Sequence, residues 1–188
     1  MIQSWSDYKR YYYADLKQTG IAKRSIFHRL KDRRYKFYRS LRRTEWIMNC
    51  HPGWHGIFSK LAQMLHTRLC NKYQWTILPN VFGEGLSIVH VGTIVVAADA
   101  KVGVNCRIHV CVNIGHAIAK GQSGVPIIGD NVYIGPGAKI FGPIQIGDNT
   151  AIGANAVVNT SFVEGNCTIA GSPARKISDN TSRRYIEV

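Results

Sequence analysis

An aliphatic residue returns at every sixth position along the stretch from Ile128 to Val158. Neither the 3.6-residue period of a helix nor the two-residue alternation of a flat strand produces such a period. It is typical of a parallel β-helix, in which short strands and tight turns form three-sided coils around inward-pointing aliphatic side chains. Gly follows most of these residues, and we expect it where the chain turns too sharply for a side chain. The aliphatic residues of the repeat are Ile128, Ile134, Ile140, Ile146, Ile152 and Val158.

The same six-residue frame occurs earlier, from Val96 to Ile114, and is interrupted after Gly115. We therefore predict a β-helix domain over residues 76–177 with a loop at residues 116–127. A loop that leaves an otherwise regular coil typically serves function or contacts a neighbouring chain. Pro173 is expected to end strand pairing, and residues 178–188 are expected to form a frayed C-terminal tail. About four coils leave two open ends, of which the helical arm can cap one, and self-association can bury the flat sides.

Residues 1–75 have a different pattern, which predicts a basic α-helical arm. Ile26, Leu30, Phe37 and Leu41 fall close to one helical face. A second helical pattern covers roughly residues 56–72, and Gly20 and the stretch 50–53 are expected breaks. The predicted fold is mainly β, with this helical arm at its N-terminus.

Positive charge is concentrated in the arm. Residues 1–75 hold 16 Lys and Arg against 4 Asp and Glu, a balance of +12, whereas residues 76–188 hold 8 against 7, a balance of +1. This leaves two alternatives for residues 1–50: a solvated basic face whose apolar side packs on the coils or a neighbouring subunit, or attachment to an anionic membrane surface. Nucleic acid is not expected, because no recognised motif accompanies the charge.

The absence of an apolar signal-peptide core or an 18-residue apolar run predicts a cytoplasmic protein. Under the membrane alternative it is peripheral at the inner face of the membrane. The five Cys residues form no CxxC pair and are expected to be reduced thiols.

Two histidines are the candidates for chemistry. His90 and His109 are 19 residues apart, about one coil, so we expect them to stack at one edge, where a neutral imidazole can take a proton from an alcohol. The alternative for His90 is a core position, since counting back from Val96 points it inward. The chain has no metal-ligand pattern, nucleophile motif, phosphate loop or paired carboxylates, so hydrolysis and phosphoryl transfer are not expected.

The hexapeptide run, the segment His90–Val96 and the sequence Ala170–Arg175 together resemble the hexapeptide-repeat acyltransferases. The similarity is to the serine acetyltransferase-like subgroup, which includes O-acetyltransferases of bacterial exopolysaccharide and capsule pathways, and it covers roughly residues 76–177. The resemblance implies a left-handed β-helix and a homotrimer with active sites between subunits. It also implies acetyl-CoA lying along the prism beside the loop, and no metal.

Carried onto this sequence, the resemblance implies that His90 is the general base. It would deprotonate the acceptor hydroxyl as that hydroxyl attacks the thioester directly, with a backbone N–H stabilising the oxyanion. His109 would support His90 or the acceptor, and His116 would bind substrate. The implied acetyl-CoA contacts are the backbone at Gly115, Pro136 and Ala154 and the basic side chains of Arg175 and Lys176.

Two departures from serine acetyltransferases bear on the acceptor. Those enzymes pair the base with an Asp about 15 residues upstream, where Trp75 or Thr76 stands here, and their helical domain is longer and supplies acidic residues. We therefore expect O-acetyl transfer to a sugar hydroxyl in surface-polysaccharide biosynthesis, on a small-molecule or lipid-linked acceptor. The alternatives are an L-serine O-acetyltransferase of cysteine biosynthesis and a non-catalytic scaffold that binds a membrane or a partner.

Overall fold

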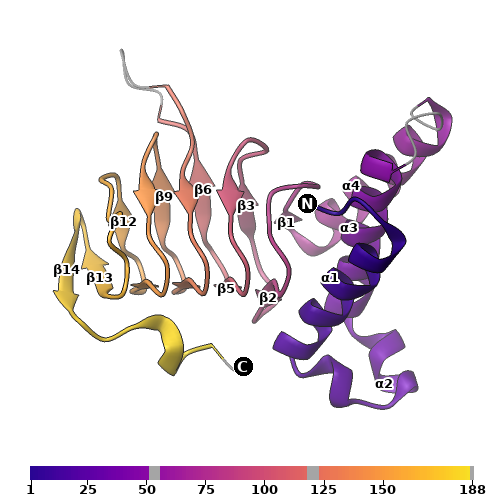
Figure 1. The fold of residues 1–188 in the computed structure, drawn as a ribbon, viewed down its shortest axis with the longest axis horizontal. Helices are drawn as coiled ribbons and strands as arrows, with labels where there is room; N and C mark the ends of the chain where they lie inside the picture. Colours follow the sequence, from indigo (N-terminus) through magenta and orange to yellow (C-terminus); the bar gives the residue numbers. More distant parts are fainter. Residues whose placement is uncertain (51–55, 118–122, 187–188) are drawn as a thin grey trace.

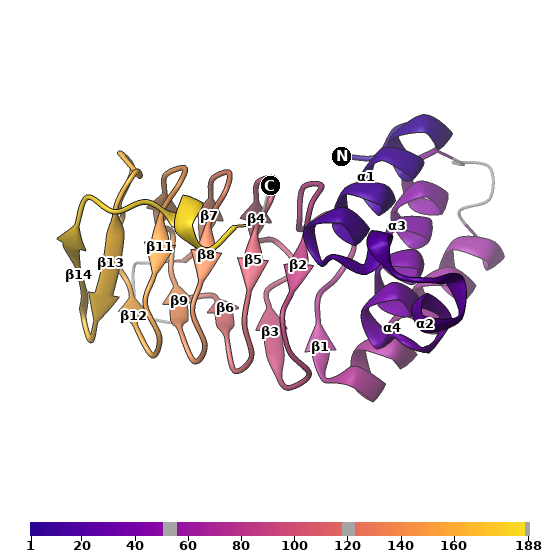
Figure 2. The ribbon, with the colours of Figure 1, turned by 90° about the horizontal axis from the view of Figure 1, so that it is seen from below.

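The computed structural model describes residues 1–50, 56–117 and 123–186. It is a three-sided stack of parallel β-coils with a layer of helices across one end, as Figures 1 and 2 show from two sides. The predicted left-handed parallel β-helix of hexapeptide repeats with an N-terminal helical region is thus confirmed.

Each side of the prism is one sheet of very short strands, and all but the last pairing in the three sheets are parallel. The first sheet consists of β1 (Trp75–Thr76), β3 (Ile94–Val96), β6 (Asn113–Gly115), β9 (Lys139–Phe141) and β12 (Val157–Val158). The second consists of β4 (Lys101–Val102), β7 (Ile127–Ile128) and β10 (Gln145–Ile146). The third consists of β2 (Ser87–Ile88), β5 (Arg107–Ile108), β8 (Tyr133–Ile134), β11 (Ala151–Ile152), β13 (Thr168–Gly171) and β14 (Ala174–Ser178).

The repeated aliphatic residues fill the axis of the prism. All six from Ile128 to Val158 are at most 2% exposed. The small residue four positions later is also buried, as Val132, Ala138 and Ala156 illustrate. The six-residue period therefore places two buried side chains on each side of a coil, which is enough to fill a narrow core.

The glycines of the repeat are required for a different reason from the sharp turn that we predicted. Gly135 has no left-handed backbone conformation, but a Cβ there would lie 2.8 Å from the backbone N of Ala154 in the next coil. The left-handed positions are instead Gly137 (φ 77°) and the asparagines of the turns, such as Asn131 and Asn149. Gly after the aliphatic residue is thus required by the close stacking of coils.

The N-terminal half is helical. It contains α1 (Trp5–Gln18), a 3₁₀ turn (Ile21–Lys23), α2 (Ile26–Lys31), α3 (Arg33–Cys50) and α4 (Ile57–Tyr73). The Ser4 hydroxyl caps α1 by accepting from the Asp7 N–H, and Asp32 starts α3 by accepting from the Arg34 N–H at 2.8 Å. The break predicted at 50–53 lies mainly outside the described residues.

The prediction of one apolar face from Ile26 to Leu41 is wrong. The chain breaks at Asp32, so Ile26 and Leu30 lie exposed on α2 while Phe37 and Leu41 are fully buried on α3. The change of direction at Asp32 rotates the two pairs of side chains away from each other.

The helices cap the first coil and share one hydrophobic core with it. Trp75, fully buried at the start of β1, packs edge-on against Phe37 at 5.2 Å between ring centroids. The Tyr38 hydroxyl accepts from the Ile88 N–H at 2.8 Å. Across the described part of the chain, no helix is both long and apolar enough to cross a membrane.

The C-terminal end also differs from the prediction. Pairing continues past Pro173, because β14 returns antiparallel to β13 and covers the last coil. Residues 179–186 pack against the prism instead of fraying: the Ser182 N–H donates to the Asn149 carbonyl at 3.0 Å and Ile186 is buried. The last two residues of the predicted tail lie outside the described residues. Figure 2 shows this yellow segment running back along the third sheet toward β5. Backbone hydrogen bonds and apolar contacts thus hold a tail whose composition is polar.

Candidate active site

His90 and His109 lie on one edge of the prism, in the turns that lead from the third sheet to the first. His90 is in the turn between β2 and β3, and His109 is in the next turn, between β5 and β6. Their ring centroids are 5.8 Å apart. His90 is exposed, so the alternative that it fills the core is wrong. Ile88 pairs with Ile108 and Val96 with Ile114, so the turn that contains His90 holds two residues more than the repeat, and Ile88 takes the inward position instead.

The two imidazoles have different surroundings. Burial, then the Arg107 guanidinium and then His90, lower the pKa of His109 below its ordinary value of 6.5, so His109 is neutral at pH 7. Among the described residues no hydrogen bond or ion pair holds the His90 ring, and its ring contact is His109. Trp75, at the position where the resemblance would place an Asp, is fully buried and cannot orient His90.

Pro136 and Ala154 continue this same edge. Pro136 is in the β8–β9 turn and Ala154 is in the β11–β12 turn, one coil further on. Successive turns are joined by backbone hydrogen bonds, from the Gly137 N–H to the Val110 carbonyl at 2.9 Å and from the Asn155 N–H to the Pro136 carbonyl at 2.8 Å. The edge is therefore a continuous line of backbone that starts at His90 and has small side chains beyond His109.

Arg175 and Lys176 stand at the far end of that line. Arg175 pairs with Ala170 in the β13–β14 hairpin, and Ala170 stacks beside Gly153. Both basic side chains are exposed, but the Lys176 ammonium contacts the Asp179 carboxylate at 2.6 Å. Arg175 is the more available cation of the two.

Gly115 and His116 lie at a different edge. Gly115 ends β6, at the opposite end of that strand from the His109 turn. The His116 Nε2 lies 3.7 Å from Asp99 Oδ2, with both side chains exposed. The structure thus brings together His90, His109, Pro136 and Ala154 within one protomer but separates His116 from them.

A cavity of about 290 Å³ adjoins His109 and was not predicted. It lies between the third sheet and the C-terminal segment that runs back over that sheet. Tyr185 stacks on Tyr133 at 4.5 Å and forms one wall. Arg107 lies two residues before His109 at an outward-facing position, so the sequence could have indicated it as a neighbour of His109. Nothing in the sequence indicated that the C-terminal segment packs over Arg107. The lining residues are Arg107, His109, Tyr133, Arg184, Tyr185 and Ile186.

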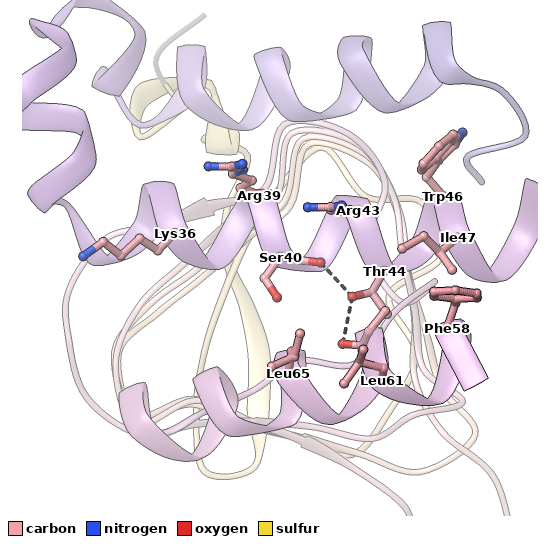
Figure 3. Close-up of a pocket in the computed structure, with 11 residues that line it drawn as sticks. Lys36, Arg39, Ser40, Arg43, Thr44, Trp46, Ile47, Phe58, Leu61 and Leu65 are labelled. Atoms are coloured by element: carbon pink, nitrogen blue, oxygen red, sulfur yellow. Dashed lines mark hydrogen bonds between the residues drawn. The ribbon is translucent and has the colours of Figure 1, made fainter. Parts of the chain in front are cut away.

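A larger cavity of about 550 Å³ lies between α3 and α4, far from the histidine pair (Figure 3). Phe58, Leu61 and Leu65 of α4 form its apolar side, and Arg39 and Arg43 lie on the α3 side. The Thr44 hydroxyl contacts the carbonyls of Ser40 and Ala62, which ties the two helices together. The described residues that line this cavity include no histidine, cysteine or carboxylate.

Known proteins resemble this chain along most of its length. A profile described as bacterial transferase hexapeptide (six repeats) matches residues 126–160. The serine acetyltransferase of Helicobacter pylori is 31% identical over 157 residues, which cover 72% of this chain and 88% of that protein. The chain belongs to the serine acetyltransferase family. The predicted membership of the hexapeptide-repeat acyltransferases is therefore confirmed.

Solved structures of the family superpose closely on this chain. The serine acetyltransferase of Brucella abortus in complex with coenzyme A has a TM-score of 0.75 and 27% identity, over 94% of this chain and 70% of that one. The soybean serine acetyltransferase complexed with serine has a TM-score of 0.73 and 28% identity, over 92% and 70%. Some curated relatives are much longer, and the matched regions span 38% to 64% of three of them.

The expectation of a polysaccharide O-acetyltransferase acting on a sugar is contradicted by these relatives, which are serine acetyltransferases. That expectation depended on Trp75 and Thr76 in place of an Asp and on a short basic arm. Neither departure removes the chain from the family, because the helical layer and the coils both superpose on its members.

Proposed function

We propose that the protein is an acetyl-CoA-dependent L-serine O-acetyltransferase. The similarity to the Helicobacter pylori enzyme over 88% of that enzyme's length carries this proposal. The pair formed by His90 and His109 at an open edge supports it, because transfer to a hydroxyl needs a base that is neutral at pH 7 and accessible to the acceptor.

His90 is the general base in this proposal. An exposed imidazole takes the proton of the acceptor hydroxyl while the hydroxyl oxygen attacks the thioester carbon. The C–S bond then breaks, the proton passes to the departing thiolate, and the acetyl ester and free coenzyme A are the products. His109 is a positioning residue, since its ring packs beside His90 and stays neutral.

Acetyl-CoA is the acetyl donor in this proposal, and it binds along the edge of the prism beyond His109. Pro136 and Ala154 leave room for an extended chain on the surface. Arg175, exposed at the far end of the edge, is a suitable partner for the phosphates of coenzyme A. Lys176 is a weaker candidate, because Asp179 already pairs with it.

We propose that Gly115 and His116 contribute to the active site of a neighbouring subunit. They lie at another edge of the same protomer, so they reach the acetyl-CoA or the acceptor only if a second copy brings them there. The proposed assembly is a homotrimer, which brings edges of adjacent prisms together.

The test is release of the coenzyme A thiol from acetyl-CoA in the presence of L-serine, with His90→Ala in parallel. Turnover of the variant should fall on the order of 100-fold or more, the usual contribution of a general base. His28→Ala is the matched control, because His28 is exposed on α2 and remote from the edge. Near-normal turnover of a folded His90→Ala variant would refute the role of His90, and no serine-dependent release by the wild type would refute the function.

A further inference from the structure

The cavity between α3 and α4 is deep because small side chains form its floor. The Thr44 hydroxyl donates to the Ser40 carbonyl at 2.8 Å, and it lies 3.4 Å from the Ala62 carbonyl of the other helix. Two helices approach this closely only where the side chains between them are small. Longer side chains line the cavity on both sides of this floor, as Figure 3 shows. The volume of about 550 Å³ lies between these two walls.

The wall that α4 contributes is apolar and exposed. Leu61 and Leu65 line the cavity one helical turn apart, and they are 43% and 48% exposed. Another face of the same helix, which includes His66 and Cys70, is buried. Helix α4 therefore presents an apolar surface to the cavity in addition to the face that it packs on the core. Exposed apolar surface of this kind is typical of a binding groove.

The wall that α3 contributes carries positive charge. Lys36, Arg39 and Arg43 line the cavity at spacings of three and four residues, and all three are exposed. None of them forms an ion pair with a carboxylate of the described residues, and α3 and α4 together contain one carboxylate, Glu45. Glu45 is buried and accepts from the Arg42 guanidinium at 3.0 Å, so it does not neutralise the wall. An anionic group is the electrostatic complement of this wall.

The dimensions of the cavity favour a narrow ligand. Its α3 wall extends from Lys36 to Ile47, about 16 Å at a rise of 1.5 Å per residue. An α-helix of 10 Å diameter and that length fills on the order of 1,300 Å³, more than twice the volume of the cavity. The volume falls instead within the roughly 300–1,000 Å³ of small-molecule pockets, which are mostly apolar with a few polar groups that fix orientation. An extended acyl chain fits such a space, whereas a partner helix does not enter it.

We propose that this cavity binds a single-chain anionic amphiphile, a fatty acid whose carboxylate lies at Arg39 and Arg43. The acyl chain lies against Leu61 and Leu65, where it removes exposed apolar surface from water. The two guanidinium groups pair with the carboxylate at the rim, where it stays partly hydrated. The site belongs to the helical layer, so the inference is independent of the acetyl transfer proposed at His90.

The test is calorimetric titration of the full-length protein with decanoate, kept below the concentration at which it forms micelles. Decanoate should bind with one molecule per chain, and decan-1-ol, which has the same chain without the charge, should bind at least about fivefold more weakly. The double variant Arg39→Gln/Arg43→Gln should remove that difference. Lys60→Gln/Arg68→Gln is the matched control, because both residues are exposed on α4 but neither lines the cavity. No binding of decanoate to the wild type, or equal affinities of the two ligands, would overturn the proposal.

Leu61→Gln and Leu65→Gln test the apolar wall. Each should weaken decanoate binding about tenfold, the weight of burying much of one leucine side chain. Met64→Gln is the control, since Met64 is 45% exposed on the same helix and does not line the cavity. All three side chains are exposed, so the folded state should tolerate each change, which unfolding in urea verifies. Unchanged affinity in both leucine variants would place decanoate elsewhere and overturn the site.

Other occupants of the cavity would give different results. Binding to vesicles that contain anionic lipid, without binding of decanoate, would assign the cavity to a membrane surface. A lower mass of Leu61→Gln than of the wild type in sedimentation equilibrium would assign it to a contact between copies of the chain. Displacement of decanoate by coenzyme A would place the acyl chain on the edge beyond His109. Each of these results would overturn the proposal, whereas an unchanged affinity for decanoate in saturating coenzyme A would support it.

Discussion

Arg42 joins the helical layer to the coils from a fully buried position on α3. Its Nε donates to Asp15 Oδ2 at 2.7 Å and its Nη1 to Glu45 Oε2 at 3.0 Å. The same guanidinium also donates to the carbonyls of Phe82 and Gly83, at 2.9 and 2.6 Å. The two carboxylates accept backbone N–H groups in turn, from Leu86 and Asn80. Every charge in this junction is therefore compensated by a hydrogen-bonded partner.

Arg42→Ala should destabilise the protein by about 3–5 kcal/mol, because it leaves two buried carboxylates without their cation. The measurement is the free energy of unfolding in urea. Arg43→Ala is the control: Arg43 is the next residue of α3, but it is exposed and should change stability by less than about 0.5 kcal/mol. Equal stabilities of the two variants would show that the junction contributes nothing to folding.

At the scale of the elements, the coils depend on how closely successive turns stack. A Cβ on Gly135 would lie 2.8 Å from both the backbone N of Ala154 and the carbonyl O of Ile152. Both obstacles are backbone atoms of the next coil, and that coil is itself fixed by its own hydrogen bonds. The strain cannot be relieved by rotating a side chain.

Gly135→Ala should therefore cost about 1–3 kcal/mol, the usual penalty of overpacking. Gly56→Ala provides a control at a glycine with nothing within 4 Å of the added carbon and no left-handed backbone. Thermal unfolding of the two variants measures the difference. A Gly135→Ala variant as stable as the wild type would mean that the coils can separate more easily than their hydrogen bonds suggest.

Helices α2 and α4 expose apolar side chains beside basic ones. Phe27 is 75% exposed and Ile57 is 81% exposed, and basic residues such as Arg33 and Lys60 are exposed near them in the chain. Attachment to an anionic membrane surface stays a prediction, and these exposed side chains are where we expect contact with the membrane. Deleting residues 1–50 would not test it, because Phe37, Tyr38 and Leu41 belong to the shared core.

Substituting Phe27 and Ile57 together by Glu should abolish sedimentation with vesicles that contain anionic lipid, since the change removes apolar contact and adds negative charge. Val163→Glu is the control, because Val163 is 61% exposed in the coils, away from the helical layer. Sedimentation of the double variant at the wild-type level would contradict the prediction, as would vesicle binding that is equally strong without anionic lipid.

At the scale of the whole molecule, the two ends of the prism are closed by different means. The helices cover the first coil through a common core, and the β13–β14 hairpin covers the last coil through backbone pairing. The flat sides are less protected, since Val95 and Ile127 are 38% and 51% exposed on the outside of the first and second sheets. Closed ends and partly apolar sides favour association side by side.

The homotrimer stays a prediction that a mass measurement can decide. Sedimentation equilibrium should give about three times the 21.0 kDa of one chain. A mass of one chain at the concentrations where the enzyme is active would contradict it. In that case Gly115 and His116 would have no route to the edge of His90.

The sequence by itself determined the coils. A six-residue period, Gly after the aliphatic residue and the 19-residue spacing of His90 and His109 are local regularities, and a repeating backbone turns each of them directly into a position in space. The helical nature of residues 57–73 was predictable for the same reason, because amphipathic periodicity is a property of consecutive residues.

Only the tertiary structure decided which residues meet across long separations. Nothing in the sequence distinguishes Arg42 from Arg39 or Arg43, because its burial depends on Asp15 and on the carbonyls of residues 82 and 83. Likewise, the polar C-terminal segment lies over Arg107 and Tyr133 through contacts that its own composition does not encode. The histidine pair followed from the repeat, whereas the cavity beside it required the packing of the tail, since a non-repeating segment finds its place only through partners distant in the chain.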